Sequence, residues 1–202
     1  CRGSRQALSC PGDHAGRLTV ERILVVGASL AGLRAAETLR REDFAGRITL
    51  VDREPYRAYN RPPLSKGVLA GTTASDALEF KLPPDLGVEW RLGVAATGLD
   101  LDRRTVTLAD GAGLPFDGLV LAGGTQPRWP RWLPRVDGAI TLRTLDDAVL
   151  LSGRLRGRAR LVVVGAGFIG CEVAATARGL GLAVTVVDLA PLPMQAALGD
   201  EL

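Results

Sequence analysis

The sequence of 202 residues predicts an α/β protein with two Rossmann-like nucleotide-binding units, the second of them incomplete. Two glycine fingerprints of the same kind, at residues 27–32 and 165–170, each follow an apolar run that is typical of a buried strand. Each fingerprint then opens a helix-like stretch, which leads to a second apolar run and an acidic residue. One such motif is a weak signal. Two in strand–turn–helix–strand context predict two bound nucleotides, most simply a flavin and a nicotinamide.

The first unit is expected to begin with a strand at about residues 22–26. The helix after Gly32 carries Leu33, Ala36 and Leu39 on one face, a spacing typical of a helix that packs on a core. A second strand is expected at residues 48–51 and ends before two acids, Asp52 and Glu54. Either acid could accept hydrogen bonds from the adenosine ribose, and their spacing from the fingerprint does not choose between them.

Each residue type in the first fingerprint has a physical reason. Gly27 permits the tight turn, and Gly32 lets the helix pack closely on the strand. The N-terminus of the helix offers free N–H groups and a partial positive charge to phosphates. Ser29 stands where the middle glycine is usual, and its hydroxyl can donate to a phosphate.

The second fingerprint has all three glycines, Gly165, Gly167 and Gly170. Strands are expected at residues 161–164 and 184–187, and Asp188 follows the second of them. A carboxylate at that position favours NAD, because it would repel the 2′-phosphate of NADP.

Between the two fingerprints, residues 52–66 are expected to form a long ordered loop, since adjacent prolines exclude a buried strand. A helix is expected to start within residues 64–70. Residues 88–120 have a β-rich composition, with a turn at 110–113 that is expected to join strands at 105–108 and 118–121. Residues 129–134 form a linker broken by prolines, and a helix is expected over residues 142–155.

We therefore expect a mobile tail at 1–21, an FAD-binding domain at 22–135 with a β-rich insertion at about 88–120, and a linker helix with the first βαβ unit of an NAD-binding domain at 136–202. Two strands and one helix cannot close a doubly wound sheet. The chain is thus expected to be the N-terminal fragment of a longer polypeptide, and the fragment alone could be inactive.

Composition argues against several other classes of protein. The net charge is only +3 and the arginines are scattered among few aromatic residues, which does not favour nucleic-acid binding. The cysteines, Cys1, Cys10 and Cys171, make no metal-binding spacing, and the only histidine is His14, so neither a metal site nor a histidine-based triad is expected. No apolar run is long enough for a membrane span or a signal peptide. A reduced, cytoplasmic protein is expected.

Three segments resemble one family. Residues 61–66 (RPPLSK), 142–148 (LRTLDDA) and 165–172 (GAGFIGCE) are similar to the FAD-dependent, NADH-using ferredoxin reductases. This family includes the rubredoxin, putidaredoxin and biphenyl-dioxygenase reductase types, and apoptosis-inducing factor is a relative. The resemblance covers about residues 22–202. It implies a glutathione-reductase-like fold with two dinucleotide-binding units, FAD and NAD as cofactors, and a ferredoxin- or rubredoxin-like iron–sulfur protein as electron acceptor.

The resemblance also implies roles for particular residues. Arg61 and Lys66 would line the flavin, and Arg143 would reach its pyrophosphate or ribityl chain. Glu172 would pair with Lys66 beside the isoalloxazine, and Lys66 and Glu172 are the expected catalytic residues. We expect both charges to be buried, so that each needs the other. Residues 122–124 (AGG) stand where the family commonly has Ala-Thr-Gly, which removes one hydroxyl near the flavin.

The complete set of expected cofactor contacts follows from the fingerprints and the resemblance together. For FAD they are Gly27, Ala28, Ser29, Leu30, Ala31, Gly32, Asp52, Glu54, Arg61, Lys66, Ala96 and Arg143. For NAD they are Gly165, Ala166, Gly167, Phe168, Ile169, Gly170 and Asp188.

The expected function is that of a flavoprotein oxidoreductase that passes electrons from NADH through FAD to the iron–sulfur protein. One alternative is a related disulfide or peroxide reductase, which would place a cysteine near the flavin where this loop has Ser65. Another is a flavoprotein similar to apoptosis-inducing factor, which binds NADH without fast turnover. Neither nucleic acid nor a membrane is an expected partner.

Overall fold

The structure, a computed structural model, describes residues 20–200. The predictions for Cys1, Cys10, His14 and most of the tail therefore lie outside the described residues. The elements in chain order are β1 (Arg22–Val26), α1 (Leu30–Arg41), β2 (Arg47–Asp52), the 3-10 helix η1 (Pro62–Ser65), α2 (Gly67–Ala70), the 3-10 helix η2 (Asp76–Leu78), β3 (Glu89–Leu92), β4 (Ala96–Asp100), β5 (Thr105–Leu108), β6 (Gly113–Pro115), β7 (Gly118–Leu121), α3 (Leu145–Leu155), β8 (Arg160–Val164), α4 (Phe168–Gly179), β9 (Ala183–Val187) and α5 (Gln195–Leu198).

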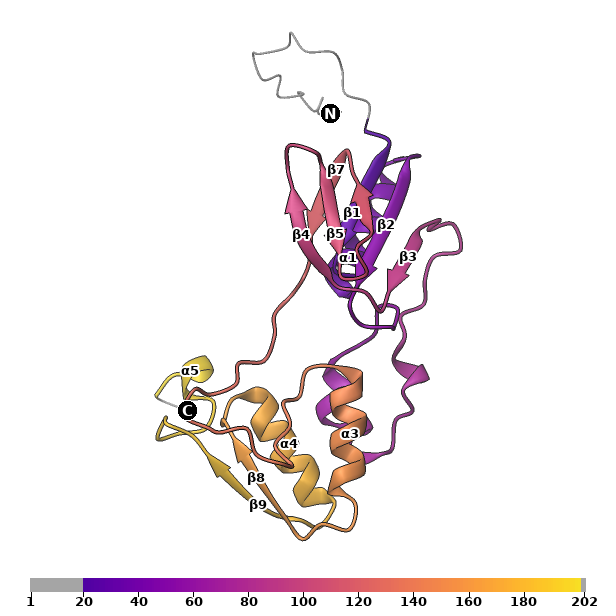
Figure 1. The fold of residues 1–202 in the computed structure, drawn as a ribbon. Helices are drawn as coiled ribbons and strands as arrows, with labels where there is room; N and C mark the ends of the chain where they lie inside the picture. The colour runs from indigo at the N-terminus through magenta and orange to yellow at the C-terminus, as the bar shows by residue number, and fades with distance from the viewer. Residues whose placement is uncertain (1–19, 201–202) are drawn as a thin grey trace, which may run out of the picture.

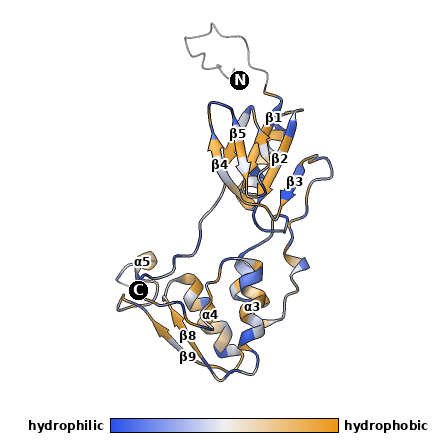
Figure 2. Cartoon of the chain, viewed as in Figure 1, coloured by the Kyte–Doolittle hydropathy of each residue, from blue (hydrophilic) through white to orange (hydrophobic). Residues whose placement is uncertain are grey.

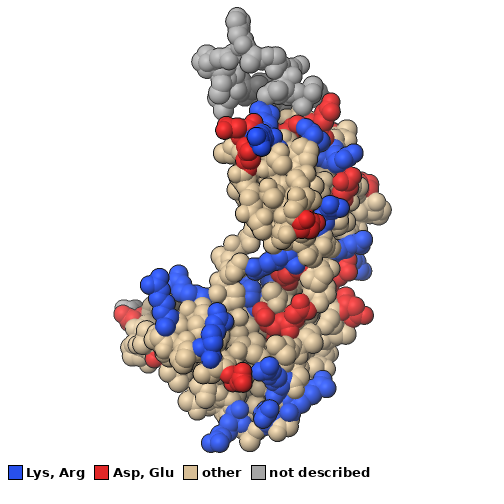
Figure 3. All heavy atoms as spheres, in the orientation of Figure 1, with Lys and Arg blue, Asp and Glu red and all other residues tan. Residues whose placement is uncertain are grey.

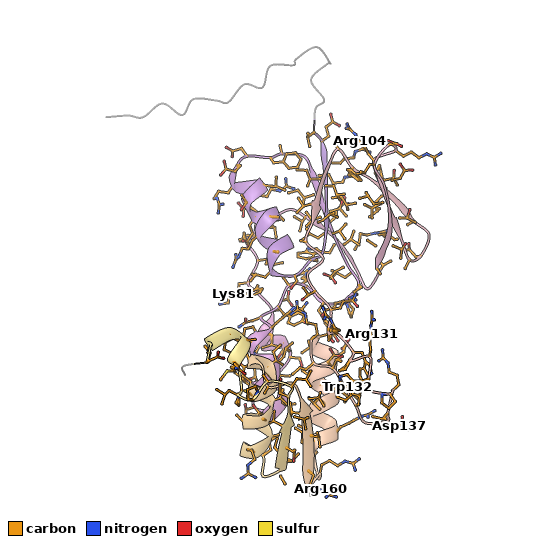
Figure 4. The ribbon with its side chains drawn as sticks, turned by 90° about the vertical axis from the view of Figure 1, so that its left-hand side faces the viewer. Lys81, Arg104, Arg131, Trp132, Asp137 and Arg160 are labelled. Carbon is orange, nitrogen blue, oxygen red and sulfur yellow. The ribbon has the colours of Figure 1, made fainter. Side chains whose placement is uncertain are left out.

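These elements form two parts that are joined by extended segments (Figure 1). One part holds α1 and the strands β1 to β7, and the other holds α3, α4, α5, β8 and β9. The chain leaves the first part after β2, returns to it before β3, and leaves it again after β7. Arg104 and Arg160 lie at the opposite ends of the molecule (Figure 4).

The first part is built on a parallel sheet with strand order β3-β2-β1-β7. β1 pairs with β2 on one side and with β7 on the other, and Val25 lies opposite Leu50 and Val120. The strand predicted at residues 22–26 is confirmed, and the one predicted at 48–51 extends by one residue at each end.

Strand β1 is buried on both faces, which explains its unbroken apolar run. Val25 packs with Leu33 and Ala36 of α1, as the helical spacing predicted. The adjacent Leu24 points to the other face, where it packs with Val106 and other residues of the antiparallel sheet β4-β5-β6. The hydropathy colouring shows apolar residues along β1, β2 and β5 (Figure 2). The parallel sheet is thus the middle of three layers.

The β-rich stretch divides between two sheets. β3 and β7 belong to the parallel sheet, and only β4, β5 and β6 form the separate antiparallel sheet. The turn after β5 leads to β6, with Thr107 opposite Gly113, so the prediction that it joins β5 directly to residues 118–121 was wrong. The three-residue strand β6 carries no alternating apolar pattern, and this is why the sequence did not show it.

The second part contains a two-stranded parallel sheet, β8-β9, covered on one face by α4 and α3. Leu161 and Val163 of β8 pack towards this core, whereas Val162 and Val164, which alternate with them, are exposed. Helix α3 begins at Leu145 and not at residue 142. Thr144 caps it with its side chain, in a capping box with Asp147 that defines the first turn.

The middle of the segment that crosses over after β2 packs on the second part, whereas Ala58 and Leu86 near its two ends belong to the core of the parallel sheet. Tyr59, Leu64 and Val68 form a cluster with Leu145 and Ala148 of α3. Leu69 packs against residues of α3 and α4, namely Leu155, Val173 and Ala177. The loop with the RPPLSK sequence therefore lies against the helix that begins at the second fingerprint.

None of the helices within residues 20–200 is both long enough and apolar enough to cross a membrane.

Candidate functional site

The two fingerprint turns have the same backbone geometry. Gly27 and Gly165 have φ values of 104° and 108°, in the left-handed region that only glycine adopts without strain. The N–H of Gly27 donates to the carbonyl of Val51 at 2.7 Å, and that of Gly165 to the carbonyl of Val187 at 2.8 Å. Each turn is therefore anchored to the end of the neighbouring strand.

The last glycine of each fingerprint is required by close packing. A Cβ added at Gly32 would lie 1.8 Å from the carbonyl oxygen of Gly27. A Cβ added at Gly170 would lie 1.9 Å from that of Gly165. No side chain fits at either position, because the contacting atom is backbone.

The middle position explains how Ser29 can replace a glycine. Ser29 has φ −80° and ψ −163°, and Gly167 has φ −75° and ψ −175°. Both are extended conformations that any residue adopts, so Ser29 leaves the turn undistorted. Its Oγ accepts a long hydrogen bond from Nε of Arg61, at 3.4 Å.

The N-termini of α1 and α4 are open, in contrast to that of α3. Neither α1 nor α4 has a side-chain cap or an acidic residue in its first turn. Helix α3 has both, since Thr144 caps it and Asp146 and Asp147 lie in its first turn. The free N–H groups of α1 and α4, with the positive end of each helix dipole, fit a phosphate group.

One acid is held in the same way behind each turn. Asp52 accepts from the N–H of Ala28 at 2.7 Å and from that of Glu54 at 2.9 Å. Asp188 accepts from the N–H of Ala166, and from that of Ala190 at 2.9 Å. These backbone donors hold the pKa of Asp188 below its ordinary value.

Glu54, the other candidate acid of the first unit, has different partners. Its carboxylate accepts from the hydroxyl of Tyr59 and pairs with Nη2 of Arg61, both at 2.6 Å. Burial, and then the hydrogen bond to Glu54, raise the pKa of Tyr59 far above its ordinary value. Arg61 also donates to the carbonyl of Arg143 at 2.8 Å. Glu54 therefore serves to orient Arg61, between the first fingerprint and the start of α3.

A cleft of about 260 Å³ lies where the RPPLSK loop meets the second fingerprint helix. Nζ of Lys66 lies 2.7 Å from Oε2 of Glu172, although 106 residues separate them in sequence (172 − 66). Lys66 and then Ser65 hold the pKa of Glu172 below its ordinary value by hydrogen bonding to it. The cleft is lined by Arg61, Pro62, Leu64, Ser65, Lys66, Leu142, Arg143, Phe168, Ile169 and Glu172.

The expectation that this ion pair is buried was wrong. The side chain of Lys66 is 51% exposed and that of Glu172 is 35% exposed. The pair lies at the open edge of the cleft, where water solvates both charges. Charges of both signs also gather at the narrow waist between the two parts (Figure 3).

The structure does not bring all the expected contacts together. Ala96 begins β4, pairs with Leu108 and lines neither this cleft nor the pocket around Ala28, Ser29 and Asp52. Leu30 and Ala31 are exposed on the first turn of α1, and Phe168 and Ile169 on that of α4. The guanidinium of Arg143 lies beside Gly124, since a Cβ there would be 3.7 Å from its Nη2.

The sequence reasoning missed the contacts made by Tyr59, Ser65 and Thr176. Tyr59 accepts from the N–H of Leu145, and Ser65 contacts both Glu172 and Thr176. Tyr59 and Ser65 stand in or beside the recognised loop, but no local pattern indicates partners that are distant in the chain.

A family model described as pyridine nucleotide-disulphide oxidoreductase matches residues 21–202. The chain belongs to the pyridine nucleotide-disulphide oxidoreductase family. The ferredoxin reductase component of chlorobenzene dioxygenase from Cupriavidus sp. (strain PS12) is 40% identical over 172 residues, which are 83% of this chain and 42% of that relative. The sequence's resemblance to ferredoxin reductases is thus confirmed.

Two solved structures of reductases support the same fold. The ferredoxin reductase for the CYP199A2 system from Rhodopseudomonas palustris matches with a TM-score of 0.82 and 37% identity, over 88% of this chain and 45% of that one. The covalent putidaredoxin reductase–putidaredoxin complex matches with a TM-score of 0.78 and 37% identity, over 87% and 44%. The predicted α/β, Rossmann-like fold class is confirmed, and the chain spans less than half the length of these relatives.

Proposed function

We propose that this chain forms part of a flavoprotein oxidoreductase that passes electrons from NADH through FAD to a ferredoxin- or rubredoxin-like iron–sulfur protein. The observation that carries this proposal is the pair of matched fingerprint turns, with a charged cleft between the RPPLSK loop and the second of them. The names of the relatives, a ferredoxin reductase component and a reductase in complex with putidaredoxin, support the choice of acceptor.

We assign FAD to the first unit, residues 22–135. The turn at Gly27 and the open N-terminus of α1 would hold the pyrophosphate, with Arg61 beside them. Asp52 is the proposed ribose acceptor, because it corresponds in geometry to Asp188 while Glu54 is engaged by Tyr59 and Arg61. When bound, FAD supplies the chemistry that accepts a hydride and releases electrons singly.

We assign NAD to the second unit, within residues 136–202. Gly165 and Gly167 are open to an approaching ligand, since an added Cβ would meet nothing within 4 Å at either position. Asp188 would accept from the ribose and disfavour a 2′-phosphate. We also propose that the enzyme works in the cytoplasm, where the nicotinamide and an iron–sulfur carrier are both available.

The cleft that holds Lys66 and Glu172 is the proposed place of electron transfer. Three cations line it, Arg61, Lys66 and Arg143. Arg61 is paired with Glu54 and Lys66 with Glu172, so one positive charge is left over, that of Arg143. This excess of positive charge favours an anionic group in the cleft, such as a diphosphate or a negatively charged reduced ring. Lys66 and Glu172 are the side chains that would orient the reacting groups there.

The donor is tested by replacing Asp188. In the complete, flavin-loaded protein, we expect NADH to reduce the flavin with a higher kcat/KM than NADPH. Asp188→Ala should narrow that preference by about tenfold, chiefly through a higher KM for NADH. Asp137→Ala, which changes an exposed acid on the linker (Figure 4), is the matched control and should leave the preference unchanged. Equal use of both donors by the unmutated protein would overturn the assignment of NAD.

Reduction assays with the complete, flavin-loaded protein also distinguish the proposed function from its alternatives. Rapid reduction of an added ferredoxin or rubredoxin at the expense of NADH supports the proposal. Turnover with a disulfide or a peroxide but not with the iron–sulfur protein would favour the related reductases. A stable complex with NADH that forms without turnover would favour a flavoprotein similar to apoptosis-inducing factor.

A further inference from the structure

Ser65 makes a short hydrogen bond between the RPPLSK loop and helix α4. It is 5% exposed, as buried as Tyr59. Its Oγ lies 2.6 Å from Oε2 of Glu172 and 3.3 Å from the carbonyl oxygen of Pro62. A hydroxyl has one proton to donate, and the shorter contact to the charged acceptor is the stronger. Ser65 therefore donates to Glu172.

Helix α4 returns a second hydrogen bond to the same residue. The hydroxyl of Thr176 donates to the carbonyl of Ser65 at 2.8 Å. Glu172 and Thr176 are four residues apart, so they lie one above the other on the same face of the helix. Ser65 is thus held by two consecutive turns of α4, once through its side chain and once through its backbone.

Both donors to Glu172 bind the same oxygen. Oε2 accepts from Ser65 and pairs with Lys66, and Oε1 has no hydrogen-bond partner within residues 20–200. Lys66 is half exposed and ends in a long flexible chain, so by itself it would hold the carboxylate loosely. The buried, short side chain of Ser65 loses little conformational entropy when it makes the same contact. The orientation of Glu172 thus depends more on Ser65 than on Lys66.

We propose that Ser65 is a positioning residue, which together with Thr176 fixes Glu172 and the start of α4 against the RPPLSK loop and leaves Oε1 free for the cleft. This inference rests on the proposed function, since it gives the carboxylate its task in electron transfer. Hydrogen bonds from Lys66 and then from Ser65 lower the pKa of Glu172, in keeping with the contact between the Ser65 hydroxyl and the carboxylate.

The test compares Ser65→Ala with Ser65→Thr and Ser75→Ala in the complete, flavin-loaded protein. Ser75 is an exposed serine whose side chain makes no cap hydrogen bond, and it is the matched control. In stopped-flow experiments with NADH, Ser65→Ala should slow flavin reduction about tenfold, the effect of losing a hydrogen bond to a charged group. The Kd for NADH should change less than the rate. Ser65→Thr, which keeps the hydroxyl, should restore most of the rate.

A second readout does not depend on activity. In the complete, flavin-loaded protein, a double-mutant cycle of Ser65→Ala and Glu172→Gln, followed by denaturant unfolding, should give non-additive changes in the free energy of unfolding. If Ser65→Ala prevents folding, a double-mutant cycle of Thr176→Val and Ser65→Cys takes its place. Thr176→Val removes the hydroxyl that donates to the backbone carbonyl of Ser65. Ser65→Cys retains the approximate volume of the side chain but donates weakly, and the two changes in the free energy of unfolding should again be non-additive.

Additive unfolding energies together with unaltered reduction by Ser65→Ala would overturn the role of Ser65. Equal effects of Ser65→Ala and Ser75→Ala would do the same. If the unmutated protein is not reduced by NADH at all, the proposed function is wrong, while the unfolding cycle still decides whether Ser65 positions Glu172.

Discussion

At the scale of single residues, the fingerprint positions differ in what they tolerate. Ser29 occupies an extended backbone conformation, so a side chain costs nothing there, and its hydroxyl is available to a ligand or to Arg61. Gly27 combines a left-handed φ with a close approach to the end of β7, where an added Cβ would lie 2.2 Å from the carbonyl oxygen of Ala122. The first fingerprint is therefore specified more by Gly27 than by its middle residue.

Replacing Gly27 with Val should abolish the incorporation of FAD. The β-branched side chain disfavours positive φ and collides with the Ala122 carbonyl, so the turn must shift away from the position that the pyrophosphate requires. The ratio of flavin to protein absorbance measures the result after purification. Gly153→Ala in α3 is the control, because a Cβ at Gly153 meets nothing within 4 Å. A fully flavin-loaded Gly27→Val protein would show that this turn is not the flavin site.

At the scale of the strands, one carboxylate ties the start of β1 to the start of β7. Asp117 accepts from the backbone N–H groups of Glu21 and Arg22 and forms an ion pair with the Arg22 guanidinium at 2.9 Å. The Arg22 hydrogen bond is the main cause that lowers the pKa of Asp117 to about 2. The two strands run parallel and have no hairpin between them, so this side chain helps to set their register.

The stability of the first part should depend on pH through Asp117. Folding lowers the pKa of Asp117 from its ordinary value of 3.8 to about 2. The contribution of this carboxylate to the free energy of unfolding is therefore complete above pH 3.8 and is lost as the pH falls through about 2. Asp117→Asn should therefore unfold at lower denaturant concentration than the unmutated protein at pH 6. The difference should shrink as the pH falls from 4 towards 2, as measured by urea titration. Asp102→Asn, in the exposed turn after β4, should show no such trend.

At the scale of the whole molecule, the crossover after β2 connects the two parts. Leu69 belongs to the core formed by α3 and α4, and Ser65 and Lys66 contact Glu172 of α4. Movement of the second part relative to the RPPLSK loop would break these contacts together. The loop thus couples the position of the second fingerprint to that of the first unit.

In a double-mutant cycle, Lys66→Met and Glu172→Gln should be weakly coupled in the free energy of unfolding but strongly coupled in the rate of flavin reduction. Because both side chains are partly exposed, the coupling in the free energy of unfolding should be at most about 1 kcal/mol. The rate of flavin reduction by NADH should nevertheless fall in each single variant. The exposed pair Arg47–Glu89 at the edge of the first sheet is the control, since Arg47→Met and Glu89→Gln should leave reduction unchanged.

The pH dependence of the Lys66–Glu172 coupling has a defined direction. The pKa of Glu172 is below its ordinary value of 4.5, so the contribution of the ion pair to stability is complete above pH 4.5 and is lost at lower pH.

A coupling of several kcal/mol between Lys66→Met and Glu172→Gln would mean that the pair is buried in the complete protein. Unaltered reduction kinetics in both single variants would show that neither side chain acts at the reacting groups.

The local pattern of the sequence determined the elements that carry the fingerprints. The apolar runs at β1, β2, β8 and β9, the helical face of Leu33 and Ala36, and the demand for glycine at Gly27 and Gly165 all depend on residues that are near one another in the chain. The sequence also carried the RPPLSK resemblance, and with it the expected pairing of Lys66 with Glu172. These inferences needed no knowledge of the packing between distant segments.

Only the tertiary structure decided which charges are exposed and which residues meet across the molecule. The spacing in the sequence did not show which of Asp52 and Glu54 would be the ribose acceptor. In the folded chain, Asp52 accepts from the backbone N–H of Ala28, whereas Glu54 contacts Tyr59 and Arg61. The spacing also did not show that Lys66 is half exposed or that Ser65 donates to Glu172. Solvent exposure and such long-range hydrogen bonds depend on how the crossover packs against α3 and α4, and that packing is a property of the whole fold.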